Sequence, residues 1–115
     1  MGIAWINGED HTATELNDAE FAEAADTLVA SCLAAAAQGD ISAYFDLGVA
    51  YSTGSHGVAC DLIEAHKWFN LAAVGGYDEA KLCRADVADE MTAREIAEAQ
   101  RRAREWIGAT SRKVA

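Results

Sequence analysis

Two apolar stripes joined by a glycine turn lie between residues 40 and 76, and they constrain the fold of the whole chain. In the first stripe Ala43, Leu47 and Tyr51 recur every four residues, the spacing of one face of an α-helix. Gly48 adds a notch in which a second helix can approach closely. Residues 61–73 repeat the spacing around Trp68. Two such helices joined by a short turn pack antiparallel, so the stretch predicts a helical hairpin.

The small and aromatic residues of the hairpin fall at fixed positions, namely Ala43, Leu47, Gly48, Tyr51, Gly54, Gly57, Val58, Asp61, Ala65, Trp68, Ala72, Ala73 and Gly76. In this order and spacing they resemble the Sel1-like repeat, a relative of the tetratricopeptide repeat, in its bacterial type. One departure is an extra residue in the turn, because Ser55 and His56 fill a gap that usually holds a single residue. We expect it to lengthen the turn without breaking the hairpin.

The resemblance implies an all-α fold, a short α-solenoid of antiparallel helical hairpins with about five helices. An internal period supports this expectation, since Gly39 and Gly76 are 37 residues apart and the stretches before them are alike. Within a helical domain at 17–108, the period separates a degenerate half repeat at 17–39, a core repeat at 40–76 and a capping repeat at 77–108. The half repeat lacks its first helix.

The residues before this domain are polar and irregular, apart from the apolar Ile3, Trp5 and Ile6. We expect residues 1–16 to form a flexible N-terminal arm. The sequence leaves open whether Trp5 docks on the open end of the solenoid. Asn17 is a good N-cap residue and predicts the start of the first helix.

The last helix carries a signal at each end. Thr92 and Glu95 have the spacing of a capping box, which predicts that the helix begins just after Thr92. Gly108 follows the apolar stripe and predicts the end of the helix. Residues 109–115 are then expected to form a short basic tail.

The formal net charge of −10 is unevenly distributed. Residues 1–66 hold eleven acidic residues and no Lys or Arg, whereas the remainder holds nine basic and eight acidic residues. Such a surface repels nucleic acid and anionic membranes and attracts a basic protein surface, so we predict neither nucleic acid nor a membrane as partner. The alternative is that the acids only keep a small protein soluble. Without a signal peptide or an apolar run of roughly 18 residues, we predict a cytoplasmic protein.

The sequence lacks the glycine, serine and histidine motifs of common enzyme classes, so we predict no catalytic residues and no cofactor. His56, Cys60 and His66 are the one constellation that suggests a metal. They lack a fourth ligand, and the simpler interpretation is a loop histidine, a half-exposed cysteine and a solvated helix histidine. We therefore predict no metal site. Cys32 and Cys83 lie on apolar stripes and are expected to be small core residues.

By the same resemblance, the first helix of each hairpin lines a concave surface that binds a partner. The expected groove residues are Ser42, Phe45, Val49 and Ser52 from one helix and Glu79, Leu82, Asp86 and Asp89 from the next. An apolar centre beside a row of acids suits a protein segment with an apolar anchor and flanking Lys or Arg. The alternative is that Phe45 caps the core, or that the arm fills the groove.

The leading prediction is thus a non-catalytic protein-interaction module. Two other functions stay open at this point. One is a small enzyme, because some Sel1-like proteins are linked by resemblance to β-lactam hydrolysis. The other is a thiol- or metal-responsive regulator acting through Cys60, which precedes a helix N-terminus. A homodimer is a further expectation, since the unpaired helix leaves Phe21, Leu28 and Cys32 in need of cover.

Overall fold

The computed structural model describes residues 18–114, apart from the side chains of residues 18–27, 56 and 112–114. The expected flexible arm, the docking of Trp5, the N-cap at Asn17 and the contacts of Phe21 lie outside the described residues and side chains. Within the described range there are five α-helices and no strand, which confirms the all-α prediction. In chain order the elements are α2 (Asp18–Ala37), α3 (Ile41–Thr53), the short 3-10 helix η1 (Ser55–Gly57), α4 (Leu62–Val74), α5 (Asp78–Ala88) and α6 (Ala93–Val114).

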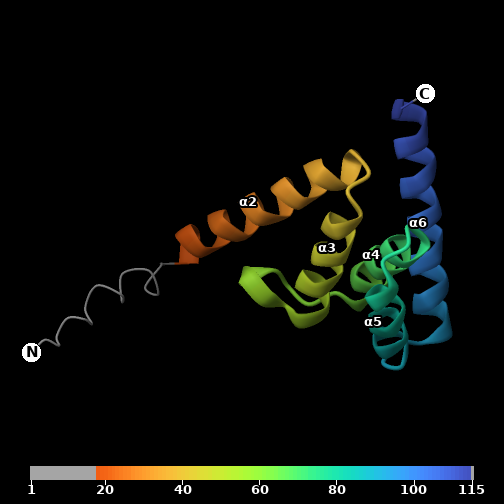
Figure 1. Cartoon of the computed structure of the whole chain (residues 1–115). Coiled ribbons are helices and arrows are strands. Elements are labelled where there is room, and N and C mark those ends of the chain that lie inside the picture. Colours follow the sequence, from red (N-terminus) through yellow and green to blue (C-terminus); the bar gives the residue numbers. More distant parts are fainter. Residues whose placement is uncertain (1–17, 115) are drawn as a thin grey trace, which may run out of the picture.

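Helix α4 lies at the centre of the fold and packs against α3, α5 and α6 (Figure 1). Its composition explains this position, because alanines alternate with large apolar residues and let neighbouring helices approach. Trp68 is among the most buried large side chains of the described chain. Helix α2 instead packs on α3 and η1, and its N-terminal half reaches away from the other helices (Figure 1).

The turn between α2 and α3 is repeated 37 residues later between α4 and α5. Gly39 and Gly76 both adopt a positive φ, 86° and 102°, which glycine reaches without the steric cost that a side chain brings. The backbone N–H of Asp40 donates to Ala35 at 3.1 Å, and that of Tyr77 donates to the equivalent Ala72 at 2.9 Å. Helices α2 and α4 therefore end in equivalent turns.

The core hairpin is closed by a close approach between α3 and α4. The aromatic ring of Phe69 lies where a side chain on Gly48 would stand. The longer connection between these helices forms η1, so the extra residue at Ser55 and His56 is taken up in the turn and the hairpin stays intact.

Helix α6 begins as expected and ends later than expected. The N–H of Thr92 donates to Glu95 at 2.9 Å and the N–H of Glu95 donates back to the Thr92 hydroxyl at 3.1 Å, which confirms the capping box. The prediction that the helix ends at Gly108 is wrong, because α6 runs on to Val114. A glycine inside a helix costs only about 1 kcal/mol, and the chain contains no proline that would stop it.

None of the helices in residues 18–114 combines the length and the apolar character that a bilayer crossing requires.

Candidate binding surfaces

The α3 residues of the expected groove lie along one flank of that helix. Ser42 is exposed, while Phe45, Val49 and Ser52 are half-buried. The ring of Phe45 stacks on Tyr77 with centroids 4.4 Å apart, and it lies 5.6 Å from the ring of Phe69. Phe45 therefore takes part in packing between α3, α4 and the start of α5. Its expected role as an anchor for a partner stays a prediction.

The expected groove residues on α5 and at its C-cap, Asp89, are all exposed. Leu82 is the most prominent of them, since 70% of its surface is accessible to solvent. Glu79, Asp86 and Asp89 flank it, and no ion pair within the described residues engages these three carboxylates. We call the eight groove residues together the α3–α5 face: Ser42, Phe45, Val49, Ser52, Glu79, Leu82, Asp86 and Asp89.

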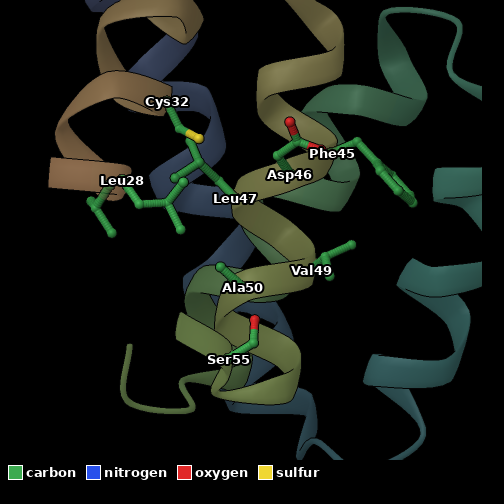
Figure 2. Close-up of a pocket in the computed structure, with 9 residues that line it drawn as sticks. Leu28, Cys32, Phe45, Asp46, Leu47, Val49, Ala50 and Ser55 are labelled. Atoms are coloured by element: carbon green, nitrogen blue, oxygen red, sulfur yellow. The ribbon is translucent and has the colours of Figure 1, made fainter. Parts of the chain in front are cut away.

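A pocket of about 420 Å³ lies between α2 and α3 and shares Phe45 and Val49 with the α3–α5 face. Figure 2 shows Leu28 and Cys32 on the α2 side of this pocket, with Phe45 and Val49 on the far flank of α3. We call it the α2–α3 pocket; its lining residues are Leu28, Val29, Cys32, Phe45, Asp46, Leu47, Val49, Ala50 and Ser55. The sequence indicated that Leu28 and Cys32 need cover. It did not predict the opposing wall from α3, because that wall depends on how α2 packs against α3.

His56, Cys60 and His66 suggested a metal site, and the structure describes the side chains of Cys60 and His66. Cys60 is exposed, and its thiol lies 3.7 Å from the carbonyl oxygen of Ser52, as a donor. The side chain of His56 lies outside the description. His66 was expected to be solvated, and this is wrong, because only 4% of its surface is exposed. Among the side chains that are described, no three His, Cys, Asp or Glu residues gather in a way that would hold a metal ion.

His66 is buried because α4 has neighbours on several sides. Its Nδ1 atom has no hydrogen-bond partner among the described atoms. Burial lowers the pKa of His66, and the nearby Arg84 guanidinium lowers it further. The Arg84 side chain donates to Asn70 at 2.6 Å, which holds the positive charge on this side of α4. His66 is thus a neutral core residue at physiological pH.

Both partly buried thiols are poor nucleophiles at neutral pH. Burial raises the pKa of Cys32, and the carboxylates of Asp46 and Asp40 raise it further. Burial likewise raises the pKa of Cys83, with Glu79 and Asp86 adding to the effect. A thiol is reactive as the thiolate, so neither environment is that of a catalytic cysteine.

A polar and aromatic cluster joins α4 to α6. The Glu64 carboxylate accepts hydrogen bonds from Arg102 at 2.7 Å and from the Trp68 indole at 3.2 Å. The ammonium of Lys67 lies 4.3 Å from the centre of the Trp68 ring and 5.6 Å from that of Trp106. Each charge has a partner, so the cluster fixes α6 on α4. Sequence analysis missed the Glu64–Arg102 pair, because no local pattern links residues 38 positions apart.

Comparisons of the chain with protein-family models, with curated proteins and with solved structures give no match.

Proposed function

We propose that the chain is a non-catalytic protein-interaction module that binds a segment of another protein on the α3–α5 face. The observation that carries this proposal is the exposure of Leu82 among Glu79, Asp86 and Asp89. A large apolar side chain on the surface gains free energy when a partner covers it. Carboxylates without an ion-pair partner in the described chain add attraction for cations at the edge of that contact.

The partner that suits this face has one apolar anchor with Lys or Arg on either side. The anchor would cover Leu82 and the accessible part of the Phe45–Tyr77 stack. The basic residues would pair with the acids beside Leu82. The N-terminal part of the chain is also strongly acidic, so its field would attract a basic partner and speed up association. Binding should therefore weaken as salt is added.

Membership of the Sel1-like repeat family belongs to the same proposal. The turn that recurs after 37 residues, with Gly39 and Gly76 in equivalent conformations, supports a tandem repeat of helical hairpins. Modules of this kind present a binding surface and leave chemistry to their partners. We also propose a cytoplasmic location, since three free cysteines suit a reducing compartment.

A displayed library of random peptides tests the proposal directly. Selection on the full chain should enrich peptides with an apolar residue flanked by Lys or Arg. For a selected peptide, Leu82→Glu should raise Kd by about tenfold or more, the loss of roughly 1.4 kcal/mol expected for a central apolar contact. Asp86→Lys should also raise Kd and should flatten its dependence on salt.

Val74→Glu is the matched control. Val74 is as exposed as Leu82, at 71%, but it lies at the end of α4 and outside the α3–α5 face. It should leave Kd unchanged. Equal effects of Leu82→Glu and Val74→Glu, or selected peptides without basic residues, would contradict the proposal.

A further inference from the structure

Helix α2 has the position of a second helix whose first helix is missing from the described chain. The equivalence rests on the repeated turn, in which Asp40 and Tyr77 donate to carbonyls at equivalent positions of α2 and α4. In the core hairpin, α4 is covered by α3, the helix that precedes it in the chain. The described chain holds no such helix before α2.

Equivalent positions on α4 and α2 differ in how deeply their side chains are buried. On α4, Ala65 and Phe69 are 0% and 2% exposed, and Phe69 fits the notch at Gly48 of α3. Leu28 and Cys32 stand 37 residues earlier, at the same positions of α2, and both are only half-buried. They line the α2–α3 pocket (Figure 2). The pocket therefore lies where a covering segment would pack on α2.

We propose that Ile3, Trp5 and Ile6 of the same chain occupy the α2–α3 pocket, so that the N-terminal segment folds back along α2. Chain order favours this occupant, because in the core hairpin the covering helix α3 directly precedes α4. The segment also has the reach. Leu28 lies ten residues after Asp18, about 15 Å from the start of α2. The twelve residues from Ile6 to Asp18 span about 18 Å even at the rise of a helix, so Ile6 can reach the level of Leu28.

Charge separates this occupant from a second copy of the chain. Residues 2–8 contain no acidic or basic side chain, so they can enter an apolar pocket whose lining holds a single charge, that of Asp46. A second copy would bring its own α2, and residues 18–40 contain five acids and no Lys or Arg. Like charges facing each other across an interface oppose association. The pocket shares Phe45 and Val49 with the α3–α5 face, but the proposed function is carried by Leu82 and the acids beside it, none of which lines the pocket.

Alkylation of Cys32 in the full chain tests the proposal. Treatment with iodoacetamide and peptide mass mapping gives the rate at Cys32, with exposed Cys60 as a reference in the same molecule. Replacing Trp5 and Ile6 by Asp should uncover the pocket and raise the rate at Cys32 at least tenfold, with no change at Cys60. Replacing Thr12 and Thr14 by Asp adds the same charge without removing an apolar side chain, and should leave both rates unchanged.

Cross-linking tests the placement without disturbing the apolar residues Ile3 and Trp5. In a chain with Cys60→Ser and Cys83→Ala, Ile6→Cys should form a disulfide with Cys32 within one molecule on mild oxidation. Thr14→Cys, placed much nearer the start of α2, should not. The proposal is overturned if both cysteines pair equally well, if the disulfides join two molecules, or if the Asp variant leaves the Cys32 rate unchanged.

Discussion

At the scale of single residues, His66 shows how a position on α4 decides chemistry. The helical pattern marked one apolar stripe on α4 and placed His66 beside it, which predicted a solvated side chain. The structure buries His66 instead, because α4 has more than one covered side. A buried imidazole that faces Arg84 resists protonation, and its lowered pKa links the stability of the fold to pH.

The stability of the protein should therefore fall in mild acid. Well above the unfolded-state pKa of about 6.5, His66 is neutral in the folded and the unfolded chain and favours neither. Below that pH the unfolded chain takes up a proton that folded His66 resists, so the free energy of unfolding decreases as pH falls. The loss is at most about 1.4 kcal/mol per pH unit for one proton.

Urea midpoints at about pH 7.5 and about pH 5.5, on either side of the histidine pKa, measure this effect. His66→Leu fills a similar volume without a titrating group, so its midpoint should fall less between the two pH values. The remaining fall then belongs to other titrating groups, among them His11 and His56. An identical fall in both proteins would show that His66 does not sense the pH.

At the scale of elements, the hairpin depends on how closely α3 meets α4. An ideal Cβ on Gly48 would lie 2.5 Å from Cδ1 of Phe69, a buried ring that also contacts Phe45. Gly48→Ala should thus lower the free energy of unfolding by about 1–3 kcal/mol, less the gain of up to about 1 kcal/mol in helix propensity. Thermal denaturation of the two proteins measures the difference.

Gly75→Ala is the control for this prediction. Its Cβ would lie at the same 2.5 Å from Ile41, but the contacted atom is the tip of a flexible, half-buried side chain that can turn aside. We expect a change within about 0.5 kcal/mol. If both variants lost the same stability, the notch at Gly48 would not be the feature that fits α3 to α4.

The end of α6 makes a second prediction at this scale. Gly108 lies inside α6 and is not among the described glycines with a positive φ. Gly108→Ala should raise the free energy of unfolding by about 0.5–1 kcal/mol, because alanine loses less backbone entropy in a helix. A left-handed helix end at Gly108, as the sequence suggested, would give the opposite sign in a denaturant titration.

At the scale of the whole molecule, the sequence predicted the architecture better than the surfaces. Helix number and hairpin order follow from local signals such as the capping box at Thr92 and the glycine at Gly39, so they were readable in advance. Contacts between residues far apart in the sequence could not be predicted in this way, and Phe45 is an example. Its position on α3 fitted a binding face, whereas its stacking on Tyr77 depends on how two hairpins meet.

The oligomeric state depends on what covers the α2–α3 pocket. If the N-terminal segment fills it, no apolar surface is left there for a second copy, and acidic repulsion opposes pairing as well. The full chain should have the monomer mass of 12.2 kDa in light scattering at low and at high salt.

A variant with Trp5 and Ile6 replaced by Asp separates the two causes. In this variant the pocket is uncovered and the chain carries two more acidic residues. It should remain monomeric at low salt. It should self-associate only at high salt, where the Debye length falls to a few ångströms and the repulsion between acidic surfaces is screened. A full chain that dimerises at low salt would instead mean that a second copy covers α2. That result would favour the homodimer expected from the sequence, because only a contact stronger than the repulsion could hold two such acidic surfaces together.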